Sequence, residues 1–200
     1  MIFAITAAIA AGLSEPAITS LFAPSDYPDW AMKRGASAAS IVEVGVDPQG
    51  KVIACRNVRN FGDDVLAKEF CRILKRKRLK PAPDRDGRVL HFYYETLIRM
   101  YLPDTRKGQD VMRIQESPDA ELAVNQLPKG TSADVKISLV YDQSGKITDC
   151  EPLNGTDRTL AAIACSQRSL FEGAIRNDAA GHPVPYLTWK NVRFSVSPQK

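Results

Sequence analysis

The sequence predicts an α+β protein of two tandem units, each a three-stranded antiparallel sheet (β-hairpin, helix, long strand) with one helix packed on it. Two observations predict this class. The stretch Asp47–Cys55 recurs as Asp142–Cys150, a shift of 95 residues, and each copy is followed by a second cysteine and then by a long stretch of alternating apolar residues. Internal repetition divides a chain into units. We expect an N-terminal apolar segment over 1–21, a first domain over 22–103, a linker over 104–117 and a second, degenerate domain over 118–200.

A short helix is expected before the first strand of each unit. Asp26 is a candidate N-cap, and Gly35 can adopt the left-handed conformation that ends a helix. The second unit has matching residues: Ser117 can cap a helix, Pro118 follows it, and Gly130 can end it. The sequence therefore predicts a second short helix between 117 and 130.

Each unit then continues as a β-hairpin. Val42, Val44 and Val46 alternate with Glu43 and Gly45, which is typical of a strand with one buried face. Asp47–Gly50 has the composition of a turn, and an apolar strand follows over 51–58. The second unit repeats this order of strand, turn and strand over 137–141, 142–145 and 146–153.

A helix and a long strand complete each unit. Asp63 or Asp64 can cap a helix that carries Leu66, Phe70, Ile73 and Leu74 at helical spacing, with Cys71 beside them. In the second unit, Leu160, Ile163, Ala164 and Cys165 follow Asp157. The closing strands are expected over 90–102 and 184–196, because apolar residues alternate through both ranges.

The four cysteines are evenly divided between the two units. Four cysteines permit three pairings, and the repeat favours Cys55 with Cys71 and Cys150 with Cys165. Disulfides belong to oxidising compartments. No Cys-x-x-Cys occurs, and both histidines lie far from the cysteines in sequence, so we expect no metal and no cofactor.

The N-terminus and the charge bear on location. Ile2–Leu13 is apolar, too short for a membrane span and suited to a secretory signal, although no Lys or Arg precedes it. A truncated membrane anchor and a buried first helix are the alternatives. The net charge of +4 supports no claim for nucleic acid or membrane binding.

Several short motifs occur in a recognisable order in the first unit. Tyr27-Pro28, Gly35, the Asp47–Gly50 turn, residues 79–82 (Leu-Lys-Pro-Ala) and the long closing strand resemble the C-terminal domain of TonB energy-transducing proteins. The resemblance covers about residues 22–103, and a more diverged copy about 118–198. It implies a periplasmic, exported protein without enzymatic activity.

The resemblance also implies a partner and a docking site. The partner is an extended peptide of an outer-membrane receptor or envelope protein, added as a strand to an exposed sheet edge, in the setting of energy-coupled transport. In the second copy the implied edge is 185–193. The residues implied in the first copy are Ser25, Asp26, Tyr27, Pro28, Val89, His91, Tyr93, Glu95, Leu97 and Arg99.

Other readings remain open. A structural envelope scaffold or homodimerisation module, in which the two units cover each other's edges, requires no transport role. The basic cluster over 72–80 is expected to complement a helix C-terminus and not to bind phosphates. His91 and His182 are expected at the surface, which disfavours a hydrolase, and Glu95 and Arg99 are expected to be solvated cross-strand partners.

Overall fold

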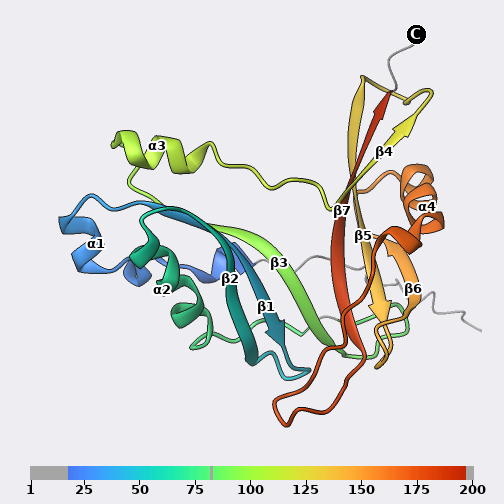
Figure 1. Cartoon of the computed structure of the whole chain (residues 1–200), viewed down its shortest axis with the longest axis horizontal. Helices are drawn as coiled ribbons and strands as arrows, with labels where there is room; N and C mark the ends of the chain where they lie inside the picture. The colour runs from blue at the N-terminus through green and yellow to red at the C-terminus, as the bar shows by residue number, and fades with distance from the viewer. Residues whose placement is uncertain (1–17, 82, 197–200) are drawn as a thin grey trace, which may run out of the picture.

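The computed structural model describes residues 18–81 and 83–196, and the fold is α+β with one mixed sheet of seven strands (Figure 1). The expected apolar segment over 1–17 lies outside these residues. The strand order is β2-β1-β3-β7-β5-β6, with β4 also paired to β7. The strands are β1 (Ala38–Val46), β2 (Val52–Gly62), β3 (His91–Met100), β4 (Ala120–Val124), β5 (Ser132–Tyr141), β6 (Ile147–Pro152) and β7 (Tyr186–Val196).

Four α-helices and three short 3-10 helices accompany the sheet in the described ranges. None of these helices is long and apolar enough to cross a membrane. The helices are η1 (Ile18–Leu21), η2 (Pro24–Asp26), α1 (Asp29–Lys33), α2 (Asp64–Leu74), α3 (Arg106–Met112), α4 (Arg158–Ser166) and η3 (Arg168–Leu170).

The expected first hairpin is present as β1 and β2. The Asp47 carboxylate accepts hydrogen bonds from the backbone N–H groups of Gln49 and Lys51, and Gly50 takes the left-handed conformation with φ of 81°. One expectation was wrong: β1 is buried on both faces, and Glu43 is only 8% exposed. Its second face is covered by Arg176 of the other half at Glu43, and by Val111 of α3 at Ala39.

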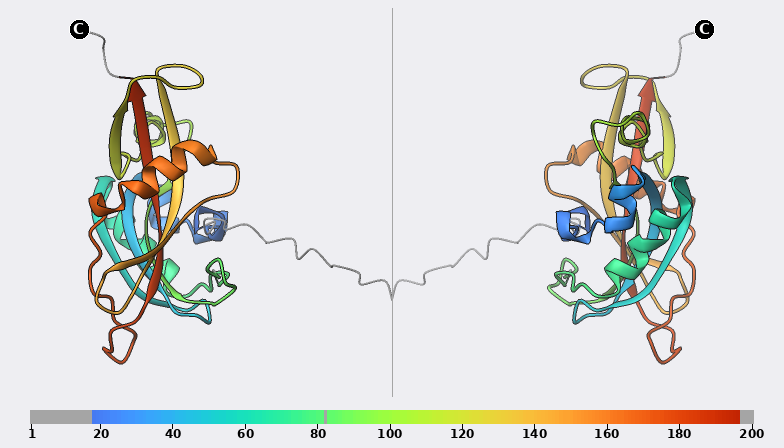
Figure 2. Two further views of the ribbon diagram at one scale, coloured as in Figure 1. Left: turned by 90° about the vertical axis from the view of Figure 1, so that its right-hand side faces the viewer. Right: turned by 90° about the vertical axis from the view of Figure 1, so that its left-hand side faces the viewer.

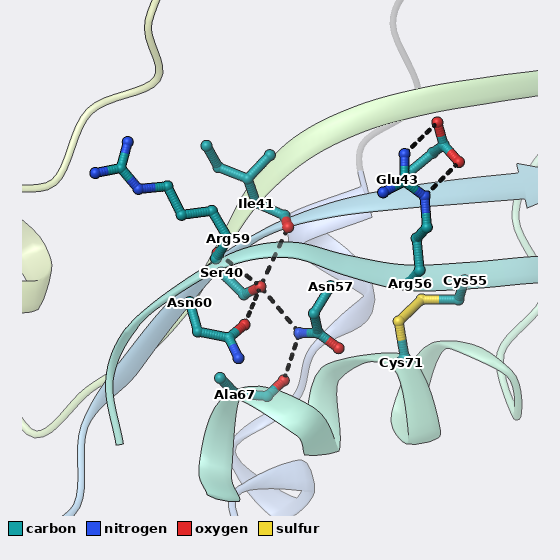
Figure 3. Close-up of a disulfide and its surroundings, with 10 residues drawn as sticks. All are labelled: Ser40, Ile41, Glu43, Cys55, Arg56, Asn57, Arg59, Asn60, Ala67 and Cys71. Carbon is teal, nitrogen blue, oxygen red and sulfur yellow. Dashed lines mark hydrogen bonds and ion pairs between the residues drawn. A yellow bond between two sulfur atoms is a disulfide. The ribbon is translucent and has the colours of Figure 1, made fainter. Parts of the chain in front are cut away.

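The helix α2 begins where the capping residues predict. Asp63 is its N-cap and accepts from the backbone N–H groups of Val65 and Leu66. The Cys55–Cys71 disulfide joins α2 to β2. Beside it, Asn57 donates both to Ser40 and to the Ala67 carbonyl, so hydrogen bonds tie β1, β2 and α2 together (Figure 3).

The second half repeats this order of elements as β5, β6, α4 and β7. Asp157 caps α4, and the Cys150–Cys165 disulfide joins α4 to β6, as predicted. Leu160 and Ala164 are buried, whereas Ile163 is 40% exposed. The helix α4 ends at Ser166, and it is shorter than α2.

The short helix expected between 117 and 130 is absent, and β4 occupies this range instead. The Asp119 carboxylate accepts from the Asn191 backbone N–H at 2.7 Å, and the Asp119 N–H donates to the Asn191 carbonyl at 2.8 Å. These bonds place the chain in register beside β7, and they stabilise an extended conformation in place of a helix. In the first half, Pro28 and not Asp26 stands at the N-cap of α1.

The two halves share one sheet through a parallel contact between β3 and β7. His91 pairs with Tyr186, and Phe92 pairs with Leu187. Figure 2 shows β7 alongside β5, with the loop before β7 projecting beyond one end of the sheet. The sequence left open whether the sheets stack or join, and they join edge to edge.

The helices α2 and α4 lie on opposite faces of this sheet. Phe92 belongs to the core under α2 and Tyr93 to the core under α4. Successive residues of a strand point to opposite faces. Leu187 and Trp189 of β7 also enter the core under α2, so each half contributes side chains to the core of the other.

Candidate functional site

The outer edge of β3 is the docking edge that the resemblance implies. On its inner side, β3 pairs with β1 from Phe92 to Met100. On its outer side, strand pairing within the described part of the chain is confined to His91 and Phe92. Beyond this contact β3 and β7 diverge (Figure 1), and a length of the β3 edge has no strand of the described residues beside it.

A crevice of about 250 Å³ lies where the two strands separate. Its β3 side includes Tyr94 and Glu95, and its β7 side includes Trp189, Lys190 and Asn191. Trp189 makes edge-on contacts with the rings of Phe92 and Tyr94, at centroid distances of 5.5 and 5.4 Å. The crevice therefore has an aromatic wall that both halves build.

Residues 114–119, which we call the crossing segment, bridge this divergence. The Glu116 carboxylate accepts a hydrogen bond from the Leu97 backbone N–H, and the Arg99 guanidinium donates to the Ile114 carbonyl. At the other end, Asp119 forms an ion pair with Lys190 at 2.7 Å. Residues 114–118 are neither helix nor strand, so side chains and not a backbone ladder hold this segment against β3.

The predicted residues of β3 have unequal environments. Glu95 is exposed, Val89 lies before the strand and is 43% exposed, and His91 is half-buried, which lowers its pKa. Tyr93 and Leu97 are buried, so their side chains are not open for docking. The expectation that Arg99 is a cross-strand partner was wrong, because its guanidinium turns to the crossing segment.

The predicted residues 25–28 hold the N-terminal segment in place. Asp26 forms an ion pair with Lys77 at 2.8 Å, and the hydrogen bond from Lys77 lowers the pKa of Asp26. The Tyr27 hydroxyl donates to the Ala36 carbonyl. Ser25 and Pro28 lie at either side of these residues, in η2 and directly before α1. The hydrogen bonds and ion pairs described for this group do not reach the β3 edge.

A polar cluster around the buried Glu43 carboxylate was not predicted. Arg176, in the loop before β7, forms a two-point ion pair with Glu43 at 3.1 and 2.5 Å, and Arg56 approaches the same carboxylate at 3.1 Å (Figure 3 shows Arg56 and Glu43). Arg176 also lies 4.8 Å from the centroid of the Tyr93 ring. The sequence feature that could have indicated this cluster is Glu43, a charged residue on an otherwise apolar strand.

The basic cluster at the end of α2 makes local contacts. Arg72 pairs with Glu69, Lys77 with Asp26, and Arg78 donates to the Gln49 carbonyl. His182 lies beside Asp178 in the loop before β7, and its side chain is 78% exposed. Within the described ranges, no three His, Cys, Asp or Glu side chains gather as a metal site.

Residues 23–99 match the family model described as Gram-negative bacterial TonB protein C-terminal. These residues are a TonB C-terminal domain. The match ends at Arg99 of β3, so the β3 edge and the residues around Tyr27 both fall inside it. No curated protein and no solved structure matches the chain.

The match bears on the role of residues 23–99. TonB C-terminal domains interact with other proteins and are not enzymes, and they act in the periplasm of Gram-negative bacteria. The two disulfides suit that oxidising compartment. The TonB C-terminal domain here carries one disulfide, and the second half carries the other.

Proposed function

We propose that the protein is a periplasmic binding protein that takes an extended peptide, from an outer-membrane receptor or another envelope partner, as an added strand on β3. Coupling to energy-dependent transport is the extension that the family suggests. We further propose that residues 118–200 are a diverged second copy of the domain at 22–103, joined by 104–117, and that an N-terminal segment over 1–21 directs export or tethers the protein.

The observation that carries the proposal is the stretch of β3 beyond Phe92, beside which the described chain has no strand. An edge strand with free backbone groups is a template for a partner's strand. Leu97 turns its N–H outward, toward Glu116. Since backbone groups alternate sides along a strand in an antiparallel pair, Glu95 presents its N–H and carbonyl on the same outer side.

A substitution at Glu95 tests this proposal. Glu95→Pro removes the outward N–H without touching the bonds to β1, and proline is tolerated at sheet edges. Glu95→Ala is the matched control, since it removes the side chain alone. The probe is a panel of short synthetic peptides that cover the periplasmic segments of the receptors from the same bacterium.

We expect the panel to contain peptides that bind the wild type and Glu95→Ala, and that bind Glu95→Pro about tenfold more weakly, the loss expected for one hydrogen bond. Hydrogen exchange of the Glu95 amide should be fast in the free protein and slow in the complex. Equal affinity for the two variants would exclude strand addition at this edge.

A scaffold role is the second candidate, because one observation favours it: β3 and β7 are already paired at one end, and the halves share their cores. In that case the two copies serve mainly to cover each other's edges. Slow exchange of the Glu95 amide in the free protein, unchanged by the peptide panel, would favour the scaffold.

A further inference from the structure

We propose that the crossing segment, residues 114–119, is a built-in competitor for the β3 edge, and that a bound peptide must displace it. This inference rests on the function proposed above and specifies how the site is regulated. The occupant it implies is an extended peptide whose backbone takes the Leu97 N–H and whose acidic side chains lie near Arg99 and Lys190, the two cations that the segment contacts.

On the β3 side, the crossing segment occupies the groups that a ligand strand would use. The Leu97 N–H is an outward donor of the edge, and the Glu116 carboxylate accepts from it. The next outward residue, Arg99, donates from its side chain to the Ile114 carbonyl. A strand that extended past Glu95 would need the space and the donor that Glu116 holds, so the two cannot bind together.

On the β7 side, the segment is held through Asp119. Its carboxylate contacts the Lys190 ammonium at 2.7 Å and the Asn191 N–H at 2.7 Å. These contacts lie next to β4, where a true strand ladder with β7 begins at Ala120. The segment is therefore anchored at its β4 end and held to β3 by side chains alone.

The crossing segment can leave β3 at a small cost in free energy. Glu116 is exposed, and Pro118 has no backbone N–H to offer to a ladder. An exposed carboxylate loses little when it returns to water, because water solvates it again. Displacement of residues 114–118 breaks no helix or strand, since these residues belong to neither.

The crevice holds two polar atoms that the crossing segment leaves unsatisfied. The Trp189 indole N–H and the Asn191 side-chain oxygen are buried with no hydrogen-bond partner among residues 18–81 and 83–196, and both residues line the crevice. Buried polar groups are normally paired. A peptide group offers one acceptor and one donor, which are the complements of these two atoms.

The charges that displacement exposes select the ligand. Departure of residues 114–118 frees the Arg99 guanidinium on β3, and departure that extends to Asp119 also frees the Lys190 ammonium on β7. Between them, Glu95 is exposed and makes no ion pair described for the chain. An incoming strand with carboxylates near Arg99 and Lys190 and a neutral residue opposite Glu95 matches this pattern.

The test compares Glu116→Ala with Glu121→Ala. Glu116→Ala removes the contact with Leu97, whereas Glu121→Ala removes an equal charge from an exposed position of β4 outside the crevice. Both positions are at the surface, so both variants should fold. The first readout needs no ligand: hydrogen exchange of the Leu97 amide, followed by NMR, should be at least tenfold faster in Glu116→Ala and unchanged in Glu121→Ala.

The second readout is the affinity of the receptor-peptide panel described above. We expect Glu116→Ala to bind the acidic peptides of the panel several-fold more tightly than the wild type, because a competitor has been weakened, while Glu121→Ala binds as the wild type does. Peptides without acidic residues should bind both proteins more weakly than acidic ones, and they too should bind Glu116→Ala more tightly than the wild type, because they compete for the same edge.

The outcomes separate this inference from the proposed function. If Leu97 exchanges as fast in the wild type as in Glu116→Ala, the segment does not hold the edge and the inference fails alone. If peptides bind both proteins equally, the competitor role fails and the proposed function stands. If no peptide binds either protein although Leu97 is released in the variant, the proposed function fails and the inference fails with it.

Discussion

The Arg176 guanidinium and the Glu43 carboxylate meet across 133 residues of sequence and form two hydrogen bonds. Arg176 comes from the loop before β7, and Glu43 from the centre of β1, so the pair fastens the second half onto the sheet of the first. The register places Glu95 directly opposite Glu43. Two adjacent carboxylates repel, and the guanidinium offsets that repulsion.

Removal of the charge of Glu43 should destabilise the protein. Glu43 is 10% exposed in its side chain, and Glu43→Gln leaves the Arg176 guanidinium without its ionic partner. We expect the free energy of unfolding in urea to fall by about 2 kcal/mol. Asp134→Asn is the control, because the Asp134–Arg193 pair is about half exposed and should contribute at most about 0.5 kcal/mol. Equal losses would contradict a fastening role for Glu43.

The same pair predicts a dependence on pH. Burial acts to raise the pKa of Glu43, but the hydrogen bonds from Arg176 and Arg56 outweigh it and hold the pKa below its ordinary value of 4.5. A lowered pKa in the folded state gives stability that is present above pH 4.5 and is lost as the pH falls through the folded value. The stability difference between the wild type and Glu43→Gln should therefore be constant near neutrality and shrink below pH 4.5. Urea titrations at several pH values measure this stability difference. A difference that grows in acid would contradict a lowered pKa of Glu43 in the folded state.

Each disulfide should contribute comparably to stability. Their cysteines are 16 and 15 residues apart, and the chain-entropy account assigns roughly 3 kcal/mol to a loop of this size. We expect Cys55→Ala with Cys71→Ala to cost somewhat more than Cys150→Ala with Cys165→Ala, because Cys71 is buried in the core and leaves a cavity. Urea unfolding of the two double variants checks this. A loss of less than about 1 kcal/mol in the free energy of unfolding for either double variant would contradict a stabilising role of that disulfide.

Gly50 should tolerate substitution far less than Gly87. Both glycines have positive φ, 81° and 79°, so the backbone strain of an alanine is similar, about 1 kcal/mol. A Cβ at Gly50 would lie 2.0 Å from the Leu79 carbonyl oxygen, whereas a Cβ at Gly87 meets nothing within 4 Å. We expect Gly87→Ala to cost about 1 kcal/mol and Gly50→Ala about 3 kcal/mol or more, because backbone must move. Thermal unfolding of the two variants measures the contrast, and similar melting temperatures would contradict it.

The parts of the fold that short-range physics determines could be predicted from sequence. The hairpins follow from alternation and from Asp-to-Gly turns, α2 and α4 from the caps Asp63 and Asp157, and both disulfides from the repeat. The strand β4 could not be found in this way. Its conformation depends on Asn191, far along the chain, which pairs with Asp119 and overrides the Ser-Pro signal for a helix.

The candidate site was predictable in outline and not in detail. The position of the docking edge on β3 came from the resemblance, and in the part of the chain that the structure describes no strand pairs with that edge beyond Phe92. Tyr93 and Leu97 were expected to contact the partner, but both are buried: Tyr93 lies in the core under α4, and Leu97 packs with Ala39 and Val111. No local pattern could have revealed the contact of Glu116 with Leu97, since it depends on how the two halves meet.

Trp189 belongs by sequence to the last strand and by packing to the first core, between Phe92 and Tyr94. Unfolding of either half therefore exposes buried apolar side chains of the other half to water. Melting should proceed as a single cooperative transition, and neither half is a self-sufficient module that could be moved intact into another protein.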